Sequence, residues 1–197
     1  MSQKIIRNLR CGLYAFYVVV VIVLVYYWYQ IVYLKNFTQD VVIAGGFSGN
    51  LAAVFFILTL LPGMFGRYGI SSSALLYVRQ VRGNLGVAMF LLATLHYMSV
   101  KIFPMLLIST FIPFKLFEVF GFLALQITFV LALTSNRFSI RRMGKWWKRL
   151  HSLSYILVWL LFGHVILQGW SLMAMALGLV ALLEVGSFGY RRWGGGR

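Results

Sequence analysis

The sequence is poor in acidic residues and in cysteine, and each shortage excludes a class of protein or site. The single thiol, Cys11, excludes an internal disulfide and a thiolate-bound metal cluster. Asp and Glu together number 3 against 18 Lys and Arg in 197 residues, a balance that in a soluble protein suggests a nucleic-acid partner. No DNA-binding or RNA-binding motif accompanies these basic residues, so we expect no nucleic-acid partner.

The chain also lacks the polar surface of a soluble globule. Apolar residues make up 61% of the sequence, and its mean hydropathy is +0.88. Six apolar stretches are long enough to cross a bilayer as helices, which takes roughly 20 residues each. They cover about residues 11–34, 41–65, 84–103, 115–135, 150–170 and 171–190. We therefore expect an all-α integral membrane protein of the cell inner membrane, with one domain over residues 1–197 and no soluble flavin or nicotinamide domain.

The basic residues fall unevenly on the two sides of this six-helix path. Along the alternating path, 15 of the 18 Lys and Arg lie on the side of both termini. Only Lys35, Lys101 and Lys115 lie on the other side. Because cytoplasmic loops of membrane proteins carry the excess of Lys and Arg, the sequence predicts a six-helix bundle with cytoplasmic N- and C-termini.

The connections between the helices carry their own signals. Residues 168–171 predict a tight turn, which makes the last two helices an antiparallel pair. Pro104 and Pro113 predict an interfacial loop or a short re-entrant piece around the apolar stretch 105–111. The glycines at 194–196 predict a flexible tail.

Several side chains near the helix ends are expected to have structural roles only. Trp146 and Trp147 predict anchors at the membrane interface. Gly45 and Gly49 form a pair of small residues that lets a neighbouring helix approach closely, without a catalytic role. Three carboxylates are expected to cap helices or to face the interface, with no evident partner in the sequence: Asp40, Glu118 and Glu184.

All three histidines of the chain fall within or at the ends of predicted membrane helices. Ionisable side chains are costly in hydrocarbon unless they are paired, hydrated or bound to a metal, so these residues are functional candidates. Counted from helix starts near Asn84 and Leu150, His96 lies about 18 Å and His164 about 21 Å along its helix. The two imidazoles therefore share a depth on different helices.

Two imidazoles at matched depth can bind one iron from opposite faces of a porphyrin. No Asp, Glu or Cys stands at this depth to complete a tetrahedral zinc shell. His96 and His164 therefore predict a b-type heme between the third and fifth helices; a hydrogen bond to a neighbouring helix is the alternative role for each histidine. The expected walls of this site are Phe90, Leu92, Tyr97, Trp159 and Phe162.

His151 lies 13 residues before His164, about 19.5 Å of helix rise, a spacing suited to a second heme near the inner surface. Its partner on the third helix would fall at Arg82 or Gly83. A heme at His151 therefore needs a Met, a water or another group as its second ligand, and a hydrogen-bonded interfacial histidine is the alternative. Arg82 lies at the membrane edge and is expected to pair with a heme propionate.

Two parts of the chain resemble a known family. The matching residues are Arg82–Gly86, His96, Ala132–Ser135, Met143, Gly144, Trp147, Leu150, His151 and Tyr155. This pattern resembles the ferric-reductase-like transmembrane domain, which includes heme-binding membrane subunits of bacterial periplasmic reductase systems and, more distantly, NADPH oxidases and metalloreductases. The resemblance is specific over residues 134–155, whereas the first, second and sixth helices match only in length and hydropathy.

The resemblance implies six helices with b heme between the third and the fifth. In the NADPH oxidases and metalloreductases, two histidines on each of these helices hold two hemes, whereas the bacterial subunits lack the inner histidine on the third helix. His96 and His164 match the outer pair, and His151 matches the inner position on the fifth helix. Arg82 or Gly83 occupies the inner position on the third helix.

The resemblance also implies an electron-transfer subunit of an oxidoreductase, with no catalytic residue of its own. The expected donor is a separate cytoplasmic flavin reductase linked to NAD(P)H, or membrane quinol. A flavin is therefore expected from a partner or at the basic cytoplasmic face. The acceptor is an extracytoplasmic reductase protein, or else ferric ion or oxygen, which would make the chain a ferric or oxygen reductase domain. Two functions of a different class stay open, namely a heme-free channel with pH-sensing histidines and a structural membrane anchor.

Overall fold

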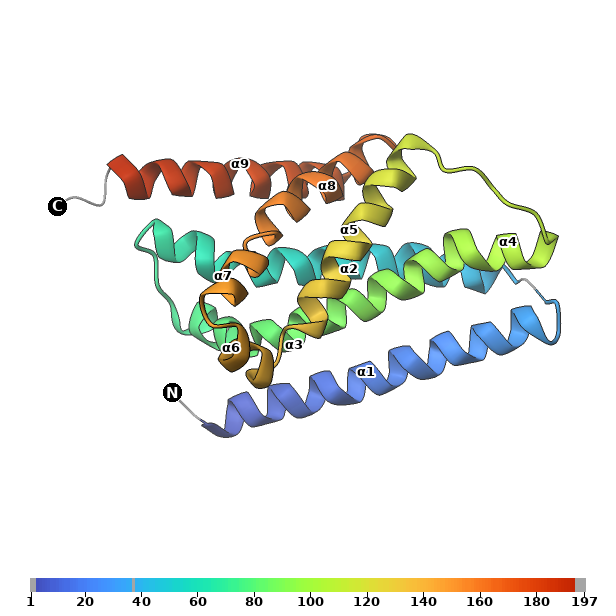
Figure 1. Cartoon of the computed structure of the whole chain (residues 1–197), viewed down its shortest axis with the longest axis horizontal. Coiled ribbons are helices and arrows are strands. Elements are labelled where there is room, and N and C mark those ends of the chain that lie inside the picture. The colour runs from blue at the N-terminus through green and yellow to red at the C-terminus, as the bar shows by residue number, and fades with distance from the viewer. Residues whose placement is uncertain (1–2, 37, 194–197) are drawn as a thin grey trace.

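The computed structural model describes residues 3–36 and 38–193, and its regular structure over these residues is entirely helical (Figure 1). The predicted tail at residues 194–196 lies outside the described residues. The elements in chain order are α1 (Gln3–Val32), α2 (Gln39–Arg67), α3 (Ser73–Tyr97), the π-helix η1 (Met98–Ile102), α4 (Phe103–Ile108), α5 (Leu116–Leu133), α6 (Arg137–Met143), α7 (Lys145–His151), α8 (Ser154–Ile166) and α9 (Leu172–Trp193).

Six helical segments of the described residues are long and apolar enough to cross a membrane. They are Gln3–Val32, Gln39–Arg67, Ser73–Ile108, Leu116–Leu133, Lys145–Ile166 and Leu172–Arg192. Large apolar side chains such as Val18, Ile22 and Val25 are more than half exposed on the outside of the bundle, as lipid contact requires. The prediction of an all-helical multi-pass membrane protein is confirmed.

Five of these spans form a closed ring. Around it, α2 packs on α3, α3 on α5, α5 on α8, α8 on α9, and α9 on α2. The interior is filled by fully buried side chains such as Phe56, Leu157 and Leu177. The remaining span, α1, packs against α3 from outside, along one edge of the bundle (Figure 1). The predicted third and fifth spans therefore face each other across the ring.

The third span is longer than the prediction of residues 84–103. It begins at Ser73, where the Ser72 hydroxyl caps the helix by accepting a 3.3 Å hydrogen bond from the Leu75 N–H. It then runs through the π-helix and α4 to Ile108. Pro104 lies in the first turn of α4, directly after the π-helix, where it supplies no N–H to the continuous helical segment. The predicted interfacial loop is therefore wrong for residues 105–108 and holds only beyond them.

The basic connection before the fifth span is helical. It folds into α6 and α7, which meet at Gly144 with a positive φ of 52°. A short turn then separates α7 from α8, closed by a 3.0 Å bond from the Leu153 N–H to the Leu150 carbonyl. The fifth span is thus two helices rather than one. The predicted turn at residues 168–171 is confirmed, and Gly169 provides its positive φ of 137°.

The connections gather at the two ends of the bundle. The start of α1, the end of α9, the α2–α3 connection, α6 and α7 all lie at one end (Figure 1). This arrangement brings the predicted cytoplasmic residues together at one end of the molecule. The side of the membrane that this end faces stays a prediction.

Candidate functional site

His96 and His164 meet inside the ring of five helices. His96 lies in the last turn of α3 and His164 in the last turn of α8. Their ring centres are 6.1 Å apart and the ring planes are inclined at 84°. The two residues that the sequence placed at matched depth are therefore neighbours in space.

Each of these imidazoles is hydrogen-bonded at Nδ1 to a backbone carbonyl of a neighbouring helix. His96 Nδ1 lies 2.8 Å from the Gly45 oxygen on α2, and His164 Nδ1 lies 2.7 Å from the Phe117 oxygen on α5. Because a carbonyl only accepts, both Nδ1 atoms carry the proton and both Nε2 atoms keep their lone pairs. The Gln168 side-chain amide lies 3.3 Å from His164 Nε2. The pair is therefore in the tautomer that offers Nε2 to a metal.

The two histidines line a cavity of about 590 Å³. Its walls come from α2, α3, α5, α8 and α9, and small side chains make the room. These are Gly46, Gly49, Ala52, Ala53, Ala93, Gly121 and Ala124. The five helices of the ring thus surround one partly open chamber beside the histidine pair.

The aromatic walls predicted for this chamber are wrong except for Tyr97, which does line it. Phe90 packs on Phe129 with ring centres 5.5 Å apart, and Trp159 is 44% exposed on the outside. Phe162 fits against Gly178 of α9, and Leu92 belongs to the packed core. The other aromatic side chains that line the chamber are Phe117, Phe122 and Trp170.

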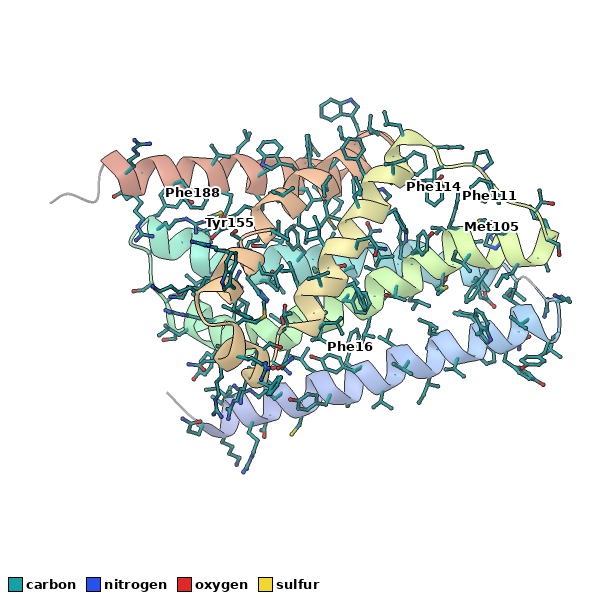
Figure 2. The ribbon with its side chains drawn as sticks, in the orientation of Figure 1. Phe16, Met105, Phe111, Phe114, Tyr155 and Phe188 are labelled. Atoms are coloured by element: carbon teal, nitrogen blue, oxygen red, sulfur yellow. The ribbon has the colours of Figure 1, made fainter. Side chains whose placement is uncertain are left out.

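A buried ion pair lies at the edge of the same cavity. The Lys101 ammonium donates to Glu118 Oε2 at 2.7 Å and to the Pro113 carbonyl at 3.0 Å. It also lies 4.6 Å from the centre of the Phe114 ring, which Figure 2 shows beside the connection that leads into α5. Lys101 is only 2% exposed. Glu118 caps α5 as predicted, and its partner Lys101, 17 residues away, was not evident from the sequence.

The π-helix explains why Lys101 reaches the histidine cavity. In an ordinary α-helix, residues five apart point in directions about 140° apart. The wider π turn over Met98–Ile102 reduces this rotation, and Lys101 lines the same chamber as His96. Such single π turns are frequent at functional sites. A lysine inside an apolar run was the only sequence signal of this arrangement.

His151 and Arg82 lie together in a second cavity, of about 450 Å³, nearer the end that carries α6 and α7. Arg79 and Lys148 also line it. Met89 lines both cavities, so they adjoin at this side chain. Arg82 is therefore on the side of His151 and does not line the chamber of His96 and His164.

His151 is held by hydrogen bonding and stacking. Its Nε2 lies 3.1 Å from the Thr134 hydroxyl, and the Trp147 ring stacks on it with centres 4.1 Å apart. The Trp147 indole N–H donates to the Thr134 carbonyl at 2.9 Å. This contact differs from the role of membrane anchor predicted for Trp147. Trp146, in contrast, is 68% exposed.

A second ion pair joins α2 to α9 near the same end. The Arg67 guanidinium pairs with Glu184, and its Nε donates to the Ser187 hydroxyl at 2.7 Å. The guanidinium also lies 4.2 Å from the centre of the Phe188 ring. Glu184 is 3% exposed, so the prediction of an interfacial carboxylate without a partner is wrong.

Comparison with known proteins supports the resemblance read from the sequence. The heme-binding subunits MsrQ of protein-methionine-sulfoxide reductase from Salmonella paratyphi B, Salmonella newport and Salmonella heidelberg are each 29% identical over 157 residues, which cover 75% of this chain and 76% of the relative. No solved structure matches. The sequence model of the family described as ferric reductase like transmembrane component matches residues 48–162, more than half of the chain, including His96 and His151. The chain therefore belongs to the ferric reductase like transmembrane component family.

Proposed function

We propose that this chain is a heme-binding membrane subunit that passes electrons across the bilayer to an extracytoplasmic reductase. The observation that carries the proposal is the pair His96 and His164, whose rings lie 6.1 Å apart beside one cavity and whose Nδ1 atoms are both hydrogen-bonded to carbonyls, which leaves Nε2 as the nitrogen that can bind iron. The family and the names of the relatives support it. His96 and His164 would be the two iron ligands.

The distance between the two rings fits this role. Two imidazoles that bind a first-row metal ion from opposite sides, at about 2.0–2.1 Å each, have ring centres about 6 Å apart. The rings of His96 and His164 are 6.1 Å apart. The volume of the chamber, about 590 Å³, lies within the range of cofactor and ligand pockets. Gln168 can leave Nε2 and keep its 2.9 Å bond to the His164 carbonyl.

A b-type heme supplies one-electron transfer when it is bound between two histidines. The residues of this chain prepare the site for it. The carbonyls of Gly45 and Phe117 hold the Nδ1 protons and thereby orient the rings. Two histidine ligands, His96 and His164, would favour electron transfer over oxygen binding at such a site.

The donor and the acceptor belong to opposite ends of the molecule. At the end that carries α6 and α7, basic side chains suit an acidic flavin reductase or a bound flavin phosphate, and membrane quinol is the other donor. At the opposite end, the names of the relatives support a methionine-sulfoxide reductase as the acceptor. In the inner membrane, the end that carries α6, α7 and both termini would face the cytoplasm, and the opposite end would face the acceptor.

Purification of the full chain in detergent tests the proposal. The expected result is a coloured protein with a low-spin b-type absorption spectrum and at least one heme per chain, which the pyridine hemochrome assay measures. A colourless protein, even after growth with added heme precursor, would contradict the proposal and favour a channel or a structural anchor.

Replacing His151 with Ala tests whether the second cavity holds a further heme. If His151 binds iron through its unoccupied Nδ1 or after leaving Thr134, the His151→Ala protein loses half of its heme. Unchanged stoichiometry means that the hydrogen bond to Thr134, at 3.1 Å, and the Trp147 stacking are the whole role of His151. Thr134→Val, which removes the same hydrogen bond without removing a ligand, is the matched control.

The Lys101–Glu118 pair is expected to set the reduction potential of the site. A positive charge in the chamber favours the reduced state of the iron, so Lys101→Met should lower the midpoint potential and Glu118→Gln should raise it. The expected shifts are tens of millivolts, the order that a partly screened unit charge gives at an effective dielectric constant of about 20. Spectroelectrochemical titration measures them. Equal shifts of the same sign would contradict this assignment.

A further inference from the structure

Two glycines that face the histidines come from helices that supply no ligand. A Cβ added to Gly49 of α2 would lie 2.7 Å from His96 Nδ1, and one added to Gly121 of α5 would lie 2.6 Å from His164 Nδ1. Real Cβ atoms do not approach other heavy atoms this closely. Both imidazoles therefore occupy space that any other residue at 49 or 121 would fill.

The same spacing recurs on the two helices. The carbonyl that accepts from His96 belongs to Gly45, four residues before Gly49, and the one that accepts from His164 belongs to Phe117, four residues before Gly121. Residues four apart lie on one face of an α-helix, one turn above the other. A side chain at the second position would therefore stand in the path of the imidazole to the carbonyl.

We propose that residues Gly45 and Gly49 of α2, and Phe117 and Gly121 of α5, form two matched imidazole seats that fix the tautomer and ring plane of His96 and His164. Each seat consists of one accepting carbonyl and, four residues later, one glycine that admits the ring. The proposal rests on the proposed function, because it assigns positioning residues to the iron ligands of that site.

The two seats fix the tautomer and the ring plane of each imidazole, which are both undetermined for a free histidine. An unrestrained neutral imidazole exchanges its proton between Nδ1 and Nε2, whereas a carbonyl at 2.7–2.8 Å keeps the proton on Nδ1 and directs Nε2 to the metal. The seats also set the ring planes, which are 84° apart. A ligand ring without its seat is free to rotate and to change tautomer.

Helix packing alone is the competing explanation, and it was the role predicted for Gly45 and Gly49. Gly178 of α9 is a glycine of that kind, since its added Cβ would lie 2.9 Å from the Phe162 ring and no histidine is among its close neighbours. Gly66, also on α2, lines neither cavity, and an added Cβ there meets nothing within 4 Å. These two residues provide controls for tight packing and for a helix glycine away from the site.

The test compares Gly49→Ala and Gly121→Ala with Gly178→Ala and Gly66→Ala in the purified full-length protein. Low-spin heme, read from the ferric absorption and electron paramagnetic resonance spectra, is the main measurement. Each of the first two variants is expected to lose at least half of the low-spin signal and to gain a high-spin signal. Gly178→Ala is expected to lower thermal stability and to keep the low-spin signal, and Gly66→Ala to change neither.

A wild-type low-spin spectrum that persists unchanged in both seat variants would overturn the proposal while leaving the proposed function intact. Heme that is absent from the wild-type protein would instead refute the proposed function. If the seat variants fail to fold, the ferric resonance spectrum of the wild type decides. Imidazole planes that are nearly perpendicular give a ferric electron paramagnetic resonance spectrum with a single, strongly shifted line. Near-parallel planes give a rhombic spectrum with three lines, and that result would overturn the proposal.

Discussion

His96→Ala and His164→Ala are each expected to abolish the low-spin b-type spectrum. Each change removes one of two ligands that face each other at a ring separation of 6.1 Å, so the remaining imidazole cannot complete the six-coordinate site. The low-spin absorption of the outer site should fall at least tenfold in each variant, with heme lost or converted to a high-spin form. Absorption spectra of equal amounts of purified protein measure this effect.

Gln168→Ala is the matched control for these ligand changes, because Gln168 contacts His164 Nε2 at 3.3 Å without being a proposed ligand. It should keep the low-spin spectrum. Size-exclusion chromatography separates loss of heme from loss of the folded chain. A low-spin spectrum that survived both histidine changes would show that the iron ligands lie elsewhere.

Breaking the Arg67–Glu184 pair is expected to have the largest effect on stability. Glu184 is 3% exposed, and its removal leaves a guanidinium that is held between α2 and α9 without its counter-charge. Figure 2 shows Tyr155 and Phe188 close together beside this pair, and their rings meet at 5.0 Å. Glu184→Ala should lower the free energy of unfolding by about 3–5 kcal/mol, as for other buried pairs that lose one partner. Equilibrium unfolding in mixed micelles measures it.

The double variant Arg67→Met with Glu184→Leu separates the pair from its surroundings. Two apolar side chains of similar size leave no unpaired charge, so most of the lost stability should return. If Glu184→Ala alone lowered the free energy of unfolding by less than about 1 kcal/mol, water or lipid headgroups would have to reach the pair, contrary to its burial.

The spans and the histidine pair could be predicted because each depends on a property of a single segment. A run of about 20 apolar residues crosses a bilayer whatever its neighbours are. Helix rise converts the positions of His96 and His164 into depths without knowledge of packing. For the same reason the excess of basic residues on one side could be counted from the sequence alone.

The walls, ion pairs and seats depend on which helices are neighbours, and this information is absent from any one segment. Phe90 and Trp159 were expected around the heme because they are near the histidines in sequence, yet they point to other helices or to lipid. Glu184 is 117 residues from Arg67, so no local pattern links them. The π turn likewise alters the helical period that the prediction assumed.

The closed ring has a consequence for the biosynthesis of the protein. Helices enter the membrane in chain order, and the contact that closes the ring joins α9, the last helix, to α2. Until α9 packs, the chamber lacks the wall that Met173 and Leu177 supply. Assembly of the cofactor site is therefore a late event, which follows insertion of the last helix into the bilayer.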